Sequence, residues 1–159
     1  ADSPQELTAA VHDNLRNLKL DVLDIVNYRV MGPEFGYTDN SVTEQITTLA
    51  ELQRKGLIRH IGLSNVTAEQ VTEAQKITDI VCVQNNYNLV TRQDDDLIDS
   101  LAEQGIAYVP YFPLGGFNPI QSATLTEIAD KLSFPNSSSF ARFFRKYTGF
   151  SPVQFRNEA

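Results

Sequence analysis

The sequence has few of the residues on which several common kinds of site depend. Cys82 is its single cysteine, and it contains one methionine and no tryptophan. A lone cysteine excludes an intrachain disulfide and any metal site built from several cysteines. Because Cys82 lies in the apolar run Ile80–Val83, we expect a buried thiol with a structural role.

Long apolar runs are also missing. No run approaches the roughly 18 apolar residues that a helix needs to cross a bilayer. The first residues, Ala1 to Pro4, lack the basic and apolar regions of a signal peptide. We therefore expect a soluble, cytoplasmic chain, and its 159 residues, 42% of them hydrophobic, can bury the core of one domain with a small appendage.

The chain has no excess of cations, since its formal net charge is −7. This charge argues against a general affinity for nucleic acids or anionic membranes. The charge is unevenly distributed, however: residues 1–132 carry 9 basic and 19 acidic side chains, whereas residues 133–159 carry 4 and 1. Such a change in composition indicates that two segments of different origin meet near the C-terminus.

Helix signals alternate with short β-branched runs over the first 111 residues. Predicted strands are 22–28, 58–63, 80–84 and 106–111. Predicted helices are 4–18, a segment from the capping box Ser41–Glu44 to near Gly56, a segment capped by Thr67, and 92–104. Four parallel βα units of this kind predict an α/β fold, in a barrel or an open sheet.

The alternation stops at about Ser122. Thr124–Glu127 reads as a further capping box, and Ser133–Asn136 breaks the short helix that follows it. An apolar stripe at helical spacing comes next, made of Phe140, Phe143, Phe144 and Tyr147. We therefore predict a small C-terminal helix-turn-helix and two domains, 1–122 and 123–159.

Polar side chains gather where the predicted strands end, which is where parallel α/β proteins bind ligands. They are Asn27, Tyr28, Arg29, Ser64, Asn65, Gln84, Asn85, Asn86 and Tyr111. Their amides, hydroxyls and aromatic rings suit a neutral planar amide ligand, and the set contains no obvious general base. At any single position the alternative is that the side chain only satisfies the backbone of a loop.

Four segments resemble consecutive strands of the aldo/keto reductases, in the right order and at the right spacing over about residues 1–128. They are Asp21–Tyr28, Leu57–Asn65, Val83–Asn88 and Gly105–Gly116. The resemblance implies half of a TIM (β/α)8 barrel and an NADP cofactor. It implies that Ser64, Asn65 and Gln84 hold the nicotinamide carboxamide, that Tyr111 stacks on the ring, and that Phe112, Leu114 and Gly115 line the pyrophosphate path.

The family's catalytic tyrosine, lysine and aspartate come from barrel strands that precede the segment this chain resembles. The position of the family's active-site histidine holds Arg29. Arginine cannot act as a base near neutral pH, although it can polarise a carbonyl. We therefore expect an oxidoreductase fragment with little or no turnover, in which NADP binding is weak or lost.

The tail resembles a second family. Residues 125–156 are similar to the second helix-turn-helix of AraC-type transcription regulators, with Ser133 in place of the usual glycine. This resemblance implies a weak DNA-binding face that includes Ser138, Arg142, Arg145 and Lys146. Two alternatives stay open: a recombined or artificial chimera without a native function, and a tail that only packs on the sheet.

Two further groups of residues could suggest a metal site. His12 and His60 have no partners at ligand spacing, and Asp94–Asp96 lies at a predicted helix start, where acidic side chains complement the helix dipole. We expect no metal in this protein.

Four parallel strands leave two unpaired edges, Val22–Tyr28 and Ile106–Tyr111, and an apolar barrel face. Two copies would supply eight strands, so we expect a homodimer in which the Phe-rich tail also covers apolar surface.

Overall fold

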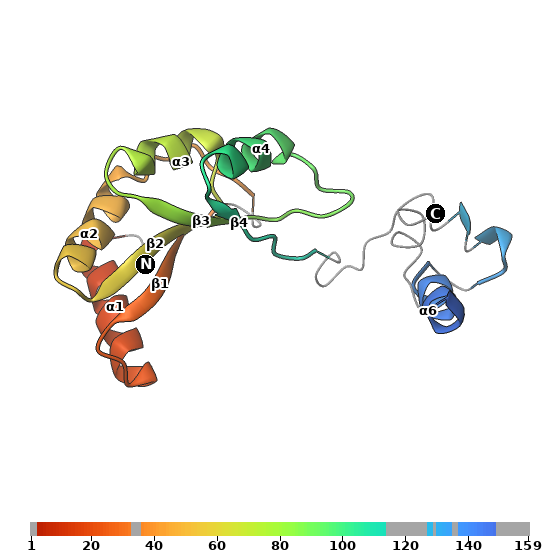
Figure 1. Ribbon diagram of the computed structural model, residues 1–159, viewed down its shortest axis with the longest axis horizontal. Coiled ribbons are helices and arrows are strands. Elements are labelled where there is room, and N and C mark those ends of the chain that lie inside the picture. The colour runs from red at the N-terminus through yellow and green to blue at the C-terminus, as the bar shows by residue number, and fades with distance from the viewer. Residues whose placement is uncertain (1–2, 33–35, 114–126, 129, 135–136, 149–159) are drawn as a thin grey trace. The chain divides into compact units, whose positions relative to one another are not determined.

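The computed structural model describes residues 3–32, 36–113, 127–128, 130–134 and 137–148 (Figure 1). The chain forms two compact units. The first consists of residues 1–87 and 93–111, and the second of residues 88–92 and 112–159. The predicted boundary between residues 122 and 123 lies outside the described residues.

A parallel sheet of four strands forms the centre of the first unit. Its strands are β1 (Leu23–Arg29), β2 (Ile58–Ser64), β3 (Ile80–Gln84) and β4 (Ala107–Tyr108), and they are paired in sequence order. Its helices are α1 (Pro4–Leu18), α2 (Thr43–Arg54), α3 (Ala68–Gln75) and α4 (Asp95–Glu103). These elements confirm the predicted α/β fold of four parallel βα units.

The last strand is shorter than predicted. β4 contains only Ala107 and Tyr108, and Tyr111 pairs with Asn86 in an isolated parallel bridge. Pro110 has no backbone N–H to donate to a ladder, which accounts for the interruption between them.

Two of the predicted helix starts are closed by capping boxes. At α1 the Ser3 hydroxyl accepts from the Glu6 N–H, and the Glu6 carboxylate accepts from the Ser3 N–H. Thr67 and Gln70 form the same reciprocal pair at α3. Both local signals were therefore sufficient to place the start of a helix.

The predicted capping box at Ser41–Glu44 is wrong. The N-cap of α2 is Val42, without a side-chain capping bond of its own. Instead, the Glu73 carboxylate of α3 accepts from the N–H groups of Val42 and Thr43, at 3.2 Å and 3.0 Å, and from the hydroxyls of Ser41 and Thr43. A carboxylate from the neighbouring helix thus satisfies the free N–H groups of α2.

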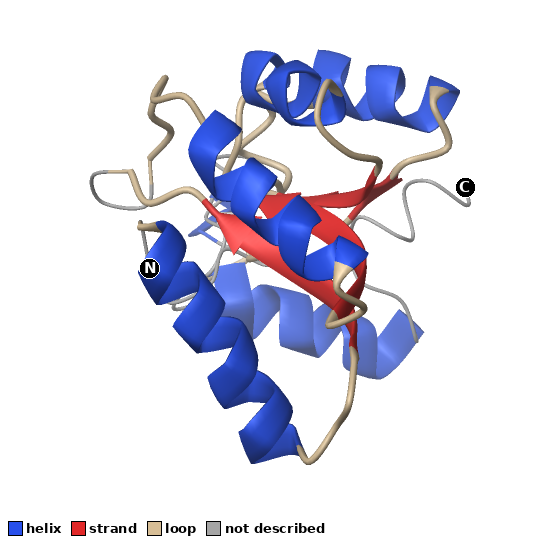
Figure 2. Ribbon diagram, turned by 90° about the vertical axis from the view of Figure 1, so that its left-hand side faces the viewer, coloured by secondary structure: helices blue, strands red, loops and turns tan. Residues whose placement is uncertain are grey.

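The hydrophobic core lies between the sheet and α1 to α4 (Figures 1 and 2). Ile61 and Leu63 of β2 and Val83 of β3 are fully buried in it. Burial of each such side chain stabilises the fold by roughly 1.5–3 kcal/mol. Their neighbours in sequence point to the other face, where Ile25 is 54% exposed.

Gly62 allows a close approach on this second face. A Cβ at residue 62 would lie 2.1 Å from Asn27 Oδ1 and 2.5 Å from Cys82 Sγ. The Asn27 side chain reaches over the glycine, and the Cys82 thiol donates to Asn27 Oδ1 at 3.3 Å. Burial raises the pKa of the thiol, and the prediction of a buried Cys82 is confirmed.

The second unit contains α6 (Ser137–Thr148). Phe134 packs against Phe140 and Phe143, with ring centroids 5.6 Å and 5.1 Å apart. Phe140 is buried, whereas Phe143 and Tyr147 are 48% and 68% exposed. Residues 124–126 and 129 of the predicted preceding helix lie outside the described residues, so a helix-turn-helix is not shown.

None of the described helices is both long enough and apolar enough to cross a bilayer.

Candidate functional site

The carboxyl ends of the strands meet at one edge of the sheet. Arg29 pairs with Ser64, and Ser64 pairs with Gln84, so the last residues of β1, β2 and β3 stand in register. Backbone bonds continue this alignment: the Asn65 N–H donates to the Gln84 carbonyl at 3.0 Å, and the Tyr111 N–H donates to the Asn85 carbonyl at 2.8 Å. The structure therefore brings together Arg29, Ser64, Asn65, Gln84 and Tyr111.

Ser64 and Asn86, both at this edge, each have a buried side-chain oxygen whose bonding is incomplete. Ser64 is only 2% exposed. Neither Ser64 Oγ nor Asn86 Oδ1 has a hydrogen-bond partner. A buried hydroxyl left unpaired costs about 1–3 kcal/mol, so such atoms call for an explanation. A ligand amide would supply the missing bond, because a hydroxyl can either donate to it or accept from it. Ser64 therefore fits the nicotinamide carboxamide that the sequence predicts there.

Asn65 is bonded mainly within the protein. Its Nδ2 donates to the carbonyls of Val30 and Gly36, at 2.9 Å and 3.0 Å, and its Oδ1 accepts from the Tyr111 hydroxyl at 3.1 Å. Its φ of 58° is left-handed, a conformation that asparagine tolerates better than most residues. Asn65 thus anchors two loops, and only the second lone pair of Oδ1 is left for a ligand.

Arg29 lies over the ring of Tyr111, with its guanidinium carbon 5.0 Å from the ring centroid. This distance is typical of a cation–π contact. The resemblance places the nicotinamide on this same ring. The contact also places the Arg29 guanidinium at the carboxyl edge of the sheet.

The remaining predicted cofactor residues are less well placed. The Gln84 side chain is partly exposed at the end of β3. Phe112 belongs to the second compact unit, where its carbonyl accepts from Asn88 Nδ2 at 3.3 Å. Leu114 and Gly115 lie outside the described residues. The pyrophosphate path therefore stays a prediction.

Asp94 behaves differently from the other residues of its acidic run. Asp95 and Asp96 lie in the first turn of α4, as expected for side chains that complement the helix dipole. Asp94 is 5% exposed, and its carboxylate accepts from Tyr37, Asn85 and Tyr108. Sequence spacing gave no signal of this cluster, because Tyr37 is 57 residues away from Asp94.

Both tyrosines of the Asp94 cluster are held as hydrogen-bond donors. Burial, helped by the neighbouring Asp94 charge and against a weaker opposing bond from Gln93, raises the pKa of Tyr37. Burial and the bond to Asp94 likewise raise the pKa of Tyr108. The two hydroxyls therefore stay protonated at neutral pH.

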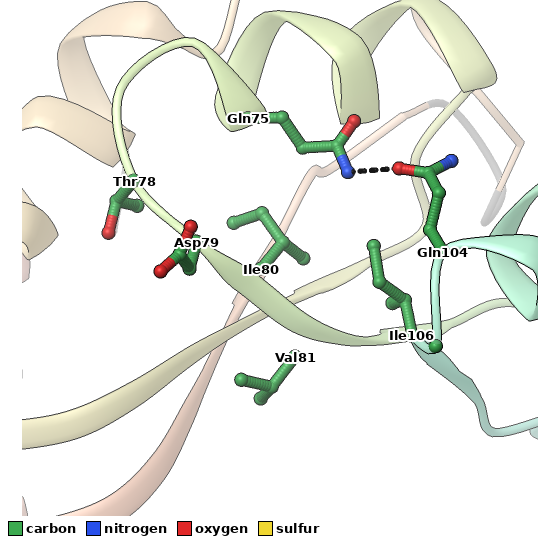
Figure 3. A pocket seen from close by; sticks show the side chains of 8 residues that line it. Gln75, Thr78, Asp79, Ile80, Val81, Gln104 and Ile106 are labelled. Atoms are coloured by element: carbon green, nitrogen blue, oxygen red, sulfur yellow. Dashed lines mark hydrogen bonds between the residues drawn. The ribbon is translucent and has the colours of Figure 1, made fainter.

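A hollow of about 480 Å³ lies at the opposite end of β3, where the strand begins (Figure 3). Gln75 Nε2 donates to Gln104 Oε1 at 2.7 Å across its wall, and Asp79 and Ile106 also line it. Parallel α/β proteins place their chemistry at the carboxyl ends of the strands. We therefore locate the candidate site at the Ser64 edge and not in this hollow.

The predicted DNA-binding residues are on α6. Arg142, Arg145 and Lys146 are exposed, and Lys146 Nζ lies 5.5 Å from the ring centroid of Tyr147. Ser138 is part of the first turn of the same helix. Within the described part of the chain, no three His, Cys, Asp or Glu side chains are grouped to hold a metal ion.

Comparison of the sequence with known proteins gives consistent results. The aldo/keto reductase family profile matches residues 1–138, which extends beyond the limit of about residue 128 expected from the resemblance. Pyridoxine 4-dehydrogenase of Escherichia coli K12 is 62% identical over 133 residues, which cover 83% of this chain and 46% of that enzyme. An uncharacterized oxidoreductase of Schizosaccharomyces pombe is 30% identical over 129 residues, covering 81% of this chain and 40% of that protein.

Solved structures show the same partial match. A thermostable aldo-keto reductase in complex with epalrestat is 28% identical, with a TM-score of 0.65, and the match covers 83% of this chain and 48% of that one. A Bombyx mori aldo-keto reductase in complex with NADP, at 22% identity and a TM-score of 0.60, has the same fold. The chain spans about half the length of these relatives. Its four parallel strands, its polar strand ends and the match over residues 1–138 together establish that the chain belongs to the aldo/keto reductase family.

Proposed function

We propose that this chain is a segment of an NADP-dependent aldo/keto reductase that retains part of the nicotinamide site and has little or no turnover by itself. The observation that carries the proposal is the buried, unpaired Ser64 Oγ at the carboxyl edge of the sheet. The name of the E. coli relative, pyridoxine 4-dehydrogenase, supports the same reaction class.

Each residue at the edge has a distinct part in this proposal. Ser64 bonds the carboxamide of the cofactor, and Tyr111 offers a ring face for stacking. When bound, the cofactor supplies a hydride to a carbonyl carbon. Arg29 polarises the carbonyl oxygen through its fixed positive charge, but it does not release a proton near neutral pH.

The part of the reaction that this segment is least able to support is donation of a proton to the carbonyl oxygen. Hydride transfer to a carbonyl needs an acid beside the oxygen. Tyr28 is buried in the core, and the Tyr87 hydroxyl donates to Asp95 at 2.6 Å, so both tyrosines have structural positions. We infer that the segment holds the cofactor but does not complete the reaction.

Cofactor binding is tested by titrating the 159-residue chain with NADPH and following the fluorescence of the cofactor. Ser64→Ala removes the unpaired hydroxyl and is expected to weaken binding about tenfold, the effect of losing one well-formed ligand bond. Ser100→Ala, on the exposed side of α4, is the matched control and should not change the affinity. Equal affinities for Ser64→Ala and the unmodified chain would refute the role of Ser64.

Turnover is tested by NADPH oxidation with an aldehyde panel that includes pyridoxal, since the name of the E. coli relative indicates that substrate class. We expect no oxidation above the rate without substrate. Robust turnover would show that another group donates the proton and would refute inactivity.

We further propose that two copies associate through the second face of the sheet. Ile25 and Val109 on or next to this face are 54% and 42% exposed, and β1 and β4 are the edges of the described sheet. Exposed edges and apolar patches favour association. Light scattering should give the mass of a dimer, and a monomer at all concentrations would exclude it.

A second candidate function is weak DNA binding by α6. Its exposed Arg142 and Arg145 can contact phosphates, but the net charge of −7 opposes the approach of DNA. An electrophoretic titration at low salt should show only weak binding, which Arg142→Ala should reduce. Submicromolar, sequence-selective binding would make this the primary function.

A further inference from the structure

Asp94 is a buried carboxylate that has no direct part in the chemistry proposed for the strand ends. Its Oδ2 accepts three hydrogen bonds. The donors are Tyr37 Oη at 3.0 Å, Asn85 Nδ2 at 2.7 Å and Tyr108 Oη at 2.8 Å. These donors come from the segment after β1, the segment after β3, and β4. One side chain at the start of α4 therefore joins three separate parts of the first unit.

Two of these connections lead to residues that adjoin or contact Asn65. Asn85 binds both backbone groups of Val66, the next residue: its Oδ1 accepts from the Val66 N–H at 3.0 Å, and its Nδ2 donates to the Val66 carbonyl at 2.8 Å. On the other side, Tyr37 follows Gly36, whose carbonyl accepts from Asn65 Nδ2 at 3.0 Å. Asp94 thus fixes the groups that hold Asn65 from two directions.

A further link runs from Asn85 through Tyr111. Its N–H donates to the Asn85 carbonyl at 2.8 Å, and its hydroxyl donates to Asn65 Oδ1 at 3.1 Å. Asn85 and Asn65 are 0% and 1% exposed, so water does not compete for these bonds. In such a buried network each bond constrains the next.

We propose that Asp94 is a positioning residue for the cofactor site. Its carboxylate fixes Asn85 and Tyr37, and these hold the Ser64–Asn65 turn and the Tyr111 ring in the geometry that receives the nicotinamide amide. The identity of the ligand rests on the proposed function, whereas the clamp is a property of the chain itself.

The acidic run provides a matched control. Asp96 lies two residues further along in the first turn of α4 and is exposed. Asp94→Asn and Asp96→Asn therefore remove the same charge from the same helix end, but only the first changes the buried network. Asparagine at position 94 also presents an NH2 group to donors that need an acceptor.

Amide hydrogen exchange, measured by NMR on the full chain, tests the clamp without any cofactor. In Asp94→Asn we expect the amides of Val66 and Tyr111 to exchange at least about tenfold faster, as in local opening. The Leu23 amide, bonded to the Leu57 carbonyl at the other end of β1, should keep its rate. Asp96→Asn should leave all three unchanged. Equal acceleration of the Leu23 amide, or no acceleration at Val66 and Tyr111, would overturn the proposal.

NADPH affinity tests the consequence for binding. Asp94→Asn should weaken binding about tenfold or more, because the network no longer orders the amide-binding turn. Val11→Ala, a buried change in α1 away from the site, should lower stability without changing the affinity. Unchanged affinity in Asp94→Asn would overturn the positioning role. If the unmodified chain does not bind NADPH, the proposed function fails, and hydrogen exchange alone decides the clamp.

Discussion

The two faces of the four-stranded sheet differ in composition and in purpose. The face covered by helices contains Leu63 and Val83, which are fully buried, whereas Ile25 on the other face is 54% exposed. The second face also has Asn27, paired with Gly62, and ends in Arg29 beside Ser64. One face therefore provides the buried core of the fold, and the other presents polar groups near the carboxyl ends of the strands. Substitutions on the two faces should have different consequences.

The largest effect should come from deletion of residues 133–159. We expect the shortened chain to aggregate, because exposed strand edges and apolar patches favour association. Size-exclusion chromatography with light scattering measures this outcome. A well-dispersed monomer after the deletion would show that the second face needs no cover.

Truncation of one side chain on each face gives a direct comparison. Leu63→Ala should lower the free energy of unfolding by about 2–5 kcal/mol, as expected for a cavity in a packed core. Ile25→Ala, measured at a concentration at which the chain is monomeric, should change it by no more than about 0.5 kcal/mol, as is usual for exposed positions. Urea denaturation of both variants provides the measurement. Similar losses would mean that both faces are buried in solution.

Gly62→Ala tests the close packing across the second face. The new Cβ must displace the Asn27 and Cys82 side chains, so we expect a loss of about 1–3 kcal/mol, typical of overpacking. Adding Asn27→Ala should recover part of this loss, because Asn27 Oδ1 is the nearest atom. Thermal unfolding of the single and double variants measures the recovery. If the double variant recovers no stability, the contact with Cys82 accounts for the loss.

The smallest effect concerns the Glu73 contact between α2 and α3. Hydrogen bonds from the Ser41 and Thr43 hydroxyls lower the pKa of Glu73 below its usual 4.5, so the ionised carboxylate stabilises the folded state. Glu73→Gln should cost about 1 kcal/mol at pH 7, comparable to the loss of a helix cap.

The pH dependence of this cost has a definite sign. A lowered pKa means that the stabilisation is present above pH 4.5 and is lost as the pH falls through the folded-state pKa. The difference between the unmodified chain and Glu73→Gln, measured by urea unfolding from pH 7 to pH 3, should therefore shrink at the acidic end. A difference that does not depend on pH would exclude the charge as its cause.

The sequence was sufficient to predict the order of strands and helices, since these depend on local patterns. The capping residues Ser3 and Thr67 and the apolar run at Ile80 each act within a few residues of the chain. The strand-end residues of the candidate site could also be predicted, because carboxyl ends of parallel strands meet at one edge.

Contacts between distant segments could not be predicted in this way. Glu73 lies 30 residues from Thr43, and Tyr37 lies 57 residues from Asp94. Nothing in the local pattern distinguishes Asp94, which is buried, from Asp96, which is exposed. Such side chains acquire their roles only when the sheet brings their elements together.

The order of the strands in the sheet has a consequence for synthesis of the chain. Within the described residues, each strand is hydrogen-bonded to the strands before and after it in the sequence, in the order β1-β2-β3-β4. A nascent chain can therefore pair each of these strands soon after it leaves the ribosome. Each new strand can pair once one further βα unit has been synthesised. Until then, the most recently paired strand forms an exposed edge of the sheet.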